Sequence, residues 1–249
     1  MIALVRSEWF KLRTIRLNIW LPLVSIGGLV LVTSLVALLT SDPEALTGED
    51  IVLTIGGFSI LVSMMIAVTT SLGITSEFNH NTIRPTLAAT PRRTQVFGAK
   101  AIVSLLFGAL IGSAGMLLAY AVGASILSAR GGSPGVSIDA GTLTALIGVV
   151  LLAVLLAGFG FGLGLLVRNG PTAVSLVILW PLLIEGILAA VLTVGGVENA
   201  QRFLPYTSAF ALASPQDSDP GRVYGGVFFA IVVVLLITAG AFVNQRRDV

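Results

Sequence analysis

Charged residues, cysteine and histidine are scarce in this chain, and each shortage excludes a class of function. Only 10% of the 249 residues are charged, against about a quarter in an average soluble domain. The absence of cysteine excludes disulfides, thiolate metal sites and cysteine nucleophiles. The single histidine, His80, is too few for the usual zinc or di-iron sites. The sequence offers no Ser/His pair and no paired buried carboxylates, so we expect no catalytic site and no cofactor bound by this chain.

The chain is instead rich in apolar sequence. Hydrophobic residues make up 55% of it, and the mean hydropathy is +1.00. Six apolar runs have roughly the 20 residues that a hydrocarbon core about 30 Å thick requires. They cover residues 19–39, 51–75, 101–127, 142–167, 171–194 and 223–243. We therefore predict an all-α polytopic membrane protein with six transmembrane helices in a single domain, residues 1–249. The first run ends in no small-residue cleavage pattern, so we expect a retained span.

Basic residues are concentrated on one side of the predicted spans. Six spans place both termini on the same side, and eleven of the 14 lysines and arginines fall there. The other side has only Arg130, Arg202 and Arg222. Because basic loops are retained in the cytoplasm, we predict that both termini are cytoplasmic. The excess of arginine over lysine and the many Ala, Gly and Val residues hint at a GC-rich bacterial genome. We expect a multi-pass protein of the bacterial cytoplasmic membrane.

The first 18 residues predict a helix that lies on the membrane surface. Ile2, Val5, Trp9 and Leu12 form one stripe of a helical wheel, with basic residues beside it. Such a helix places Trp9 at headgroup depth and its basic groups near anionic lipid. The alternative is an ordinary positive flank before the first span.

The longest polar interruption is the segment 76–100, which contains EFNHNTIRPTLAATPRRTQVFGAK. It has four basic residues, Arg84, Arg92, Arg93 and Lys100, and one acid, Glu77. Spans two and three flank it, so it is expected on the cytoplasmic side.

Capping residues and prolines divide this segment into two helices. Asn81 or Thr82 can cap a short first helix, and Thr90-Pro91 can begin a second one that continues into span three. Ile83 and Leu87 are four residues apart and share a face of the first helix. A groove on a soluble partner can grip such a helix. By composition alone, a positive loop that serves only topology remains the alternative.

Glu185 is an ionisable residue far from either end of span five, in the sequence WPLLIEGIL. Such a group costs at least about 2.5 kcal/mol on insertion scales, so it is expected to face the bundle interior or a wet cavity. One interpretation is a group on the substrate path or a proton carrier. The other is a glutamate that hydrogen-bonds to a neighbouring helix, or that lies near a shallow outer end, because Pro181 interrupts the helix just before it.

The connection 195–222 has an apolar and aromatic patch that is too short to span the membrane. We interpret it as a re-entrant pair of helices in the outer leaflet, in which Tyr206 keeps its hydroxyl wet; a packed extracellular loop is the alternative. Glycines in spans three and four are interpreted as packing positions rather than a pore. They are Gly108, Gly112, Gly158, Gly160, Gly162 and Gly164.

Three patches resemble the permeases of type-2 ATP-binding-cassette (ABC) transporters. SEWFKLRT at residues 7–14 is similar to the interfacial helix of that family. Glu77, followed by Asn-Thr-Ile, Leu87, Pro91-Arg92-Arg93 and Lys100, resembles its cytoplasmic coupling loop. FLPYTSAFAL at residues 203–212 looks like its outer re-entrant element. The order of the three patches within six spans extends the resemblance over the whole chain. One departure is Asn81, where the family usually has glycine.

The resemblance implies that residues 76–100 are a coupling helix held by a separate ATPase subunit. Glu77 would begin it, Thr82, Ile83 and Leu87 would form its contact face, and the arginines would pair with acids of the ATPase. The outer element would help to close the exit, through Phe203, Leu204, Pro205, Tyr206 and Phe210. This chain has no GxxxxGK[ST] phosphate-binding loop. ATP and magnesium therefore belong to the partner, which is expected in two copies beside a second permease half, either another copy or a paralogue.

These observations favour an ABC exporter subunit that moves a drug, antibiotic or lipid-like molecule and binds membrane lipid but no nucleic acid. A second hypothesis is a proton-coupled secondary carrier that uses Glu185. A third is a membrane scaffold that transports nothing.

Overall fold

The computed structural model describes residues 2–14, 16–89, 93–135, 140–214 and 221–246, which are almost entirely helical. Within these ranges there is no strand, only an isolated bridge between Thr47 and Ser133. Six helical segments are long and apolar enough to cross a membrane, which confirms an all-α protein with six candidate spans. They are α2 (Arg16–Leu39), α3 (Gly48–Asn79), α5 (Arg93–Ala129), α6 (Ala140–Val167), the pair α7–α8 (Gly170–Leu179 and Glu185–Val194) and α10 (Arg222–Arg246).

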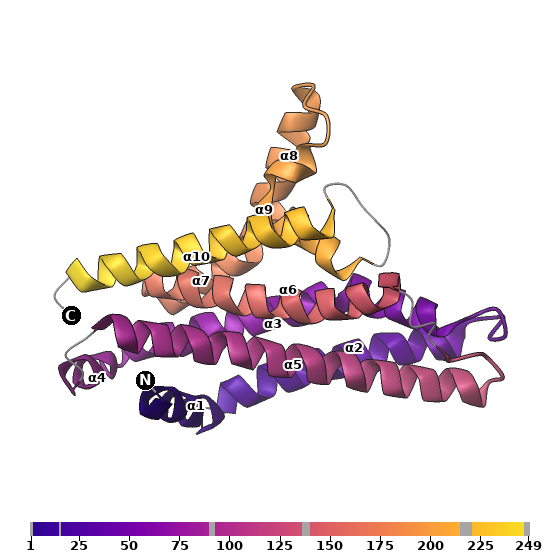
Figure 1. Cartoon of the computed structure of the whole chain (residues 1–249), viewed down its shortest axis with the longest axis horizontal. Helices are drawn as coiled ribbons and strands as arrows, with labels where there is room; N and C mark the ends of the chain where they lie inside the picture. The colour runs from indigo at the N-terminus through magenta and orange to yellow at the C-terminus, as the bar shows by residue number, and fades with distance from the viewer. Residues whose placement is uncertain (1, 15, 90–92, 136–139, 215–220, 247–249) are drawn as a thin grey trace.

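The helices α3 and α6 form the middle of the bundle. α6 packs against α3, α5 and α10, while α2 lies against α3 and α5. Figure 1 shows these helices along the long axis of the molecule, with both termini and the short helix α4 (Ile83–Ala89) toward the same end. We call this end the α4 end. An even number of spans requires this placement of the termini.

Two helices on either side of α4 are longer than a bilayer requires. α3 has 32 residues and α5 has 37, which at 1.5 Å per residue give lengths of about 48 and 55 Å. The hydrocarbon core is only about 30 Å thick. Both helices therefore extend beyond it as continuous rods. The expectation that the second helix of the polar segment continues into span three is met, since α5 runs unbroken from Arg93.

Glycines bring the central helices into close contact, as the sequence predicted. A Cβ atom added to Gly160 would collide with the backbone of Ala67 in α3, and one added to Gly108 would lie 2.7 Å from the Cβ of Ala157 in α6. Thr70 adds a hydrogen bond between α3 and α6, donating through Oγ1 to the carbonyl of Ala157 at 2.9 Å. The other predicted glycines also face a neighbouring helix: Gly164 faces α3, Gly112 faces α6, and Gly158 and Gly162 face α10.

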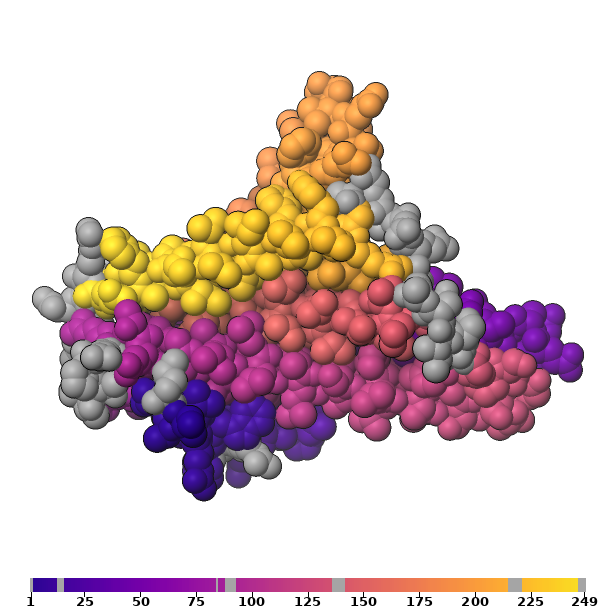
Figure 2. All heavy atoms as spheres, in the orientation of Figure 1, coloured from indigo at the N-terminus to yellow at the C-terminus, as the bar shows by residue number. Residues whose placement is uncertain are grey.

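Span five bends where Pro181 interrupts it. Residues Trp180–Ile184 form a π-helical turn, η1, between α7 and α8, as expected where proline removes a backbone donor. Beyond the turn, α8 leaves the bundle in Figure 1, and its atoms stand out from the body of the molecule in Figure 2. Much of the apolar side chain area of α8 is exposed, including that of Ile187 and Val191.

The connection after α8 forms three short helical turns rather than a pair of longer helices. They are η2 (Ala200–Phe203), α9 (Pro205–Ala209) and η3 (Phe210–Ala213). These turns pack against α3, α6 and α10. The close approach depends on glycine, because added Cβ atoms would collide with carbonyl oxygens of the turns at Gly56, Gly148 and Gly225.

Candidate functional site

The helix α4 connects the ends of α3 and α5 through a tight turn. Asn81 in this turn has a left-handed backbone with φ of 55°, a conformation that asparagine tolerates better than most residues other than glycine. Asparagine is therefore compatible with the backbone that this turn requires. Thr82 follows it, donating through its hydroxyl to the carbonyl of Glu77 at 3.4 Å.

The two apolar residues of α4 face the protein itself. Ile83 is 1% and Leu87 8% exposed, and both belong to a core cluster with Ile74, Val96 and Phe97. This corrects the expectation that they form an exposed contact face. They instead attach α4 to the ends of α3, α5 and α6. The surface that α4 leaves open to a partner includes Thr82 and Pro85, which are exposed.

The structure describes only some of the arginines that the sequence predicts as docking residues in the segment 76–100. Arg93 is half-buried at the first residue of α5. For Arg84 the structure describes the backbone, inside α4. Arg92 lies outside the described residues.

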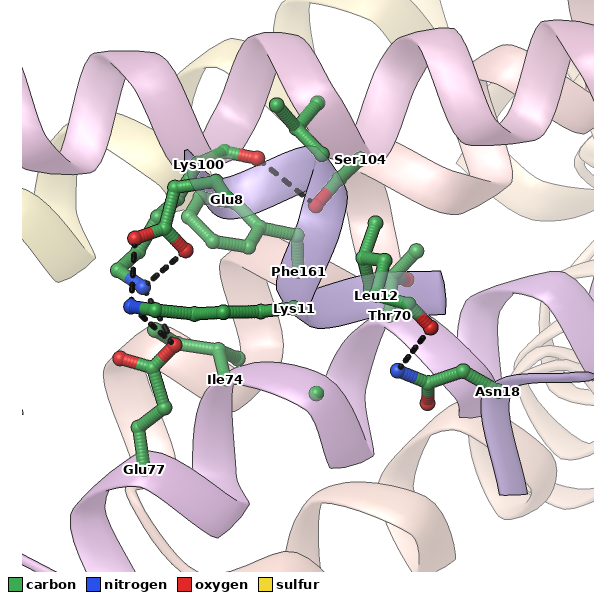
Figure 3. Close-up of a pocket in the computed structure, with 12 residues that line it drawn as sticks. Glu8, Lys11, Leu12, Asn18, Thr70, Ile74, Glu77, Lys100, Ser104 and Phe161 are labelled. Atoms are coloured by element: carbon green, nitrogen blue, oxygen red, sulfur yellow. Dashed lines mark hydrogen bonds and ion pairs between the residues drawn. The ribbon is translucent and has the colours of Figure 1, made fainter. Parts of the chain in front are cut away.

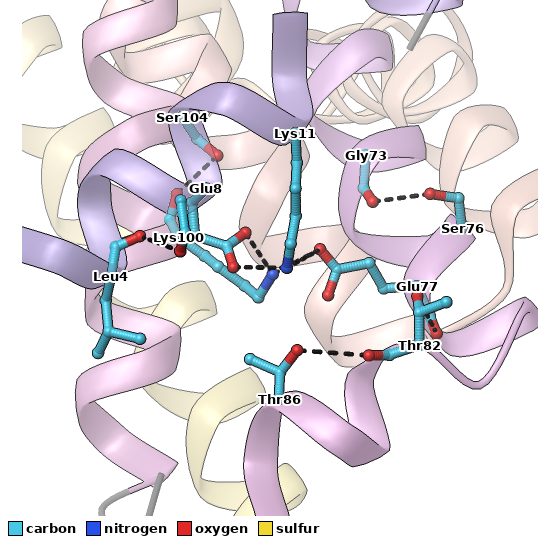
Figure 4. A network of polar contacts seen from close by, with 11 residues as sticks. Leu4, Glu8, Lys11, Gly73, Ser76, Glu77, Thr82, Thr86, Lys100 and Ser104 are labelled. Atoms are coloured by element: carbon cyan, nitrogen blue, oxygen red, sulfur yellow. Dashed lines mark hydrogen bonds and ion pairs between the residues drawn. The ribbon is translucent and has the colours of Figure 1, made fainter. Parts of the chain in front are cut away.

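A cluster of four charged residues connects α1 (Ile2–Thr14) to both helices beside α4 (Figure 4). The ammonium of Lys100, in α5, lies 2.6 Å from Glu8 of α1 and 2.5 Å from Glu77 of α3. Lys11 of α1 adds contacts of 2.8 Å to Glu8 and 3.8 Å to Glu77. We call Glu8, Lys11, Glu77 and Lys100 the ion cluster. It joins α1 to α3 and α5, the two helices on either side of α4.

Most of the ion cluster is shielded from water. The side chains of Lys100 and Glu8 are 5% and 7% exposed, whereas that of Lys11 is 43% exposed. The four residues line a cavity of about 40 Å³ together with Asn18, Thr70 and other residues (Figure 3). Two acids and two bases cancel in charge, which reduces the cost of burial. One oxygen of Glu77 has no hydrogen-bond partner among the described residues.

The charges of the ion cluster shift the pKa of both residues in α1. Burial acts to raise the pKa of the Glu8 carboxyl, but the ammonium groups of Lys100 and Lys11 outweigh it, and the pKa is lowered. Burial acts to lower the pKa of Lys11, but Glu8 and Glu77 outweigh it, and the pKa is raised. Both shifts favour the charged forms, so the docked position of α1 is coupled to pH.

The sequence alone does not predict the ion cluster, although Glu77 and Lys100 both belong to the predicted coupling segment. It predicts one membrane-surface helix over residues 1–18, whereas α1 ends at Thr14 and α2 begins at Arg16. Ile2 is exposed, while Trp9 and Leu12 pack against the core and Glu8 is buried. A signal was present: Lys11 and Lys100 are the only two lysines of the chain, and both lie in this cluster.

Glu185 ties span five to the connection that follows it. Its side chain is 1% exposed. One carboxylate oxygen accepts from the backbone N–H of Tyr206 at 2.8 Å, and the other accepts from the backbone N–H and hydroxyl of Thr207, both at 2.7 Å. The indole N–H of Trp180 donates to the same oxygen as Tyr206, at 3.1 Å. Of the two interpretations from sequence, this geometry favours a hydrogen-bonded anchor over a group on a substrate path.

The predicted outer-gate residues divide between the core and the surface. Leu204 and Tyr206 are buried, while Phe203 and Phe210 are exposed and Pro205 begins α9. The ring of Tyr206 packs edge-on against Phe159 and Phe229. The expectation of a wet tyrosine hydroxyl is wrong, because this hydroxyl is buried and has no hydrogen-bond partner among the described residues.

No family model matches this chain, and no curated protein matches it.

Proposed function

We propose that this chain is the membrane-spanning permease subunit of an ABC transporter. The α4 segment (Asn79–Arg93) would be the docking element for a separate ATP-binding subunit on the cytoplasmic side. ATP and magnesium would be bound in that subunit, present in two copies. A second permease half, a copy or a paralogue, would complete the transporter. The cargo would be a hydrophobic or amphipathic molecule that is exported.

The observation that carries this proposal is the mechanical attachment of α4. Its apolar side is buried in the chain through Ile83 and Leu87, and the ion cluster fixes its two flanking helices to each other and to α1. Both flanking helices continue without a break through the bundle. A force applied to the exposed side of α4 would therefore move α3 and α5 as rods rather than deform a loop.

Co-purification tests the proposal. We expect the solubilised protein to carry an ABC ATPase, recognised by its P-loop sequence, and to alter its rate of ATP hydrolysis. Thr82→Trp and Arg93→Glu change the side of the α4 segment that a partner can reach and leave Ile83 and Leu87 in place. Each is expected to reduce recovery of the ATPase about tenfold, which corresponds to 1.4 kcal/mol of binding free energy.

Matched controls stand elsewhere on the chain. Thr193 in α8 and Arg202 in η2 are exposed, so Thr193→Trp and Arg202→Glu repeat the same chemical changes away from α4. They are expected to retain the ATPase. Equal recovery of the ATPase with all four variants, or an ATPase-free protein that transports cargo, would contradict the proposal.

A further inference from the structure

A long apolar groove runs between α6 and α10. Its volume is about 760 Å³. Its walls are aliphatic and include Ile147 and Leu151 of α6 and Val227 and Ala230 of α10. Leu151 and Val227 are 46% and 55% exposed, so the groove is open along its side to the surrounding hydrocarbon rather than enclosed in the protein.

The groove has the length of one leaflet. Its lining on α6 extends from Thr144 to Leu155, eleven steps of about 1.5 Å, or roughly 16 Å. One leaflet supplies half of a hydrocarbon core about 30 Å thick, or roughly 15 Å. An acyl chain that stands upright in this leaflet would therefore fill the groove from end to end.

A fixed positive charge lies at one end of the groove. Arg222 donates through Nε to the carbonyl of Ser214 at 2.8 Å and through its guanidinium to the hydroxyl of Thr144. These bonds hold the guanidinium across the two helices that form the walls. Because α10 is a span that begins at Arg222, this end lies at the depth of the lipid headgroups. Tyr224 is beside it, its hydroxyl donating to the carbonyl of Arg202 at 3.1 Å, as is typical of tyrosine at a membrane interface.

We propose that this groove is a binding site for one anionic glycerophospholipid, from the leaflet opposite the α4 end. One acyl chain lies along Ile147, Leu151 and Val227, and the phosphate accepts hydrogen bonds from the guanidinium of Arg222. The aliphatic walls favour an acyl chain, and the positive charge of Arg222 at the end of the groove favours an anionic headgroup. This proposal does not depend on a partner ATPase or on transport.

Native mass spectrometry in detergent tests the proposal, with phosphatidylglycerol and phosphatidylcholine of the same acyl chains in equal amounts. We expect one phosphatidylglycerol per chain to be retained in preference to phosphatidylcholine. Leu151 is partly exposed, so Leu151→Trp places an indole in the open groove rather than in the packed core. This variant is expected to lower the occupancy of phosphatidylglycerol about tenfold. Arg222→Gln is expected to abolish the preference between the two lipids. Leu235→Trp, on an exposed part of α10 outside the groove, is the control and is expected to behave as wild type.

A second measurement avoids variants altogether. Phosphatidylglycerol with a photoreactive group on one acyl chain is expected to label peptides from 144–155 and 222–230 of the wild-type protein in vesicles. Equal occupancy in Leu151→Trp and wild type, labelling spread evenly over all lipid-facing helices, or stronger retention of a free fatty acid than of phosphatidylglycerol would overturn the proposal. Loss of a dimer with Leu151→Trp at unchanged lipid occupancy would also overturn it, and would assign the groove to a second copy of the chain.

Discussion

At the scale of single residues, two buried polar networks fix the arrangement of apolar helices. Helix packing in lipid gains little from the hydrophobic effect, since lipid tails are as apolar as the helices themselves. Specific polar contacts therefore decide where a segment lies. The ion cluster places α1 at the α4 end, and Glu185 places α9 against span five. Each network can be tested with a substitution that keeps the shape of the side chain.

The two lysines of the ion cluster form a matched pair for mutation. Lys100→Met removes the buried cation shared by Glu8 and Glu77 and leaves them only the half-exposed Lys11. Breaking a buried ion pair in this way typically costs about 3–5 kcal/mol. Lys11 is 43% exposed, so Lys11→Met is expected to cost about 1 kcal/mol or less. The measurement is the free energy of unfolding of both variants in the same detergent. Equal losses would contradict the arrangement described for the cluster.

Glu185→Gln is expected to destabilise the protein without changing its shape. An amide presents one acceptor oxygen and an NH₂ group. In either orientation, the amide nitrogen would face two donors, either those of Thr207 or the Tyr206 N–H and the Trp180 indole. Buried donors left without acceptors cost about 1–3 kcal/mol each. Thermal unfolding should show the loss, with ATPase-dependent transport retained at low temperature. Unchanged stability together with abolished transport would instead favour the proton-coupled carrier.

At the scale of secondary-structure elements, the contacts between helices depend on small residues and on the docking of α1. Glycines of α6 lie against backbone atoms of α3. The contact between these two helices therefore leaves no room for a larger side chain at the glycine positions. α1 is held differently, by ionised groups at the edge of the bundle. The contact between α3 and α6 is therefore sensitive to side-chain volume, and the docking of α1 is sensitive to pH.

Gly160→Ala is expected to separate α3 from α6. The added methyl group would collide with the backbone of Ala67, which cannot turn away as a side chain can. Overpacking of this kind typically costs about 1–3 kcal/mol. Gly57→Ala in α3 is the control, because a Cβ atom there has no neighbour within 4 Å, and alanine is favoured over glycine in a helix by about 0.8–1 kcal/mol. The measurement is the melting temperature, which should fall for Gly160→Ala and stay level or rise for Gly57→Ala.

The docking of α1 is expected to be lost in acid and in strong base. The pKa of Glu8 is lowered from its ordinary value of 4.5, so its ion pairs stabilise docking fully above that pH and less as the pH falls through the lowered pKa. The pKa of Lys11 is raised from 10.5, so its contribution is present below that pH and is lost as the pH rises through the raised pKa. Hydrogen exchange of residues 2–14 in nanodiscs should therefore be slowest between the two values. Exchange independent of pH, after correction for intrinsic rates, would contradict this coupling.

At the scale of the whole molecule, the sequence predicted the architecture well and the contacts poorly. Six spans follow from the length and composition of the apolar runs, and the Gly residues of α6 indicated close packing in advance. The ion cluster could not be derived, because it joins Glu8 to Lys100 across 92 positions and depends on where α1 folds back. The burial of Ile83 and Leu87 was missed for a similar reason: a pair four residues apart defines a face of a helix but not what covers that face.

We propose that a separate ATPase pushes on the α4 end of the bundle. The chain has no native cysteine, so Thr82→Cys provides a single attachment point for a photoreactive cross-linker, and Thr193→Cys provides the matched control on α8. Cross-linking in native membranes is the most direct measurement. We expect an adduct between position 82 and an ABC ATP-binding subunit, and none from position 193. Labelling of position 82 only from outside the cell, with no such adduct, would contradict it.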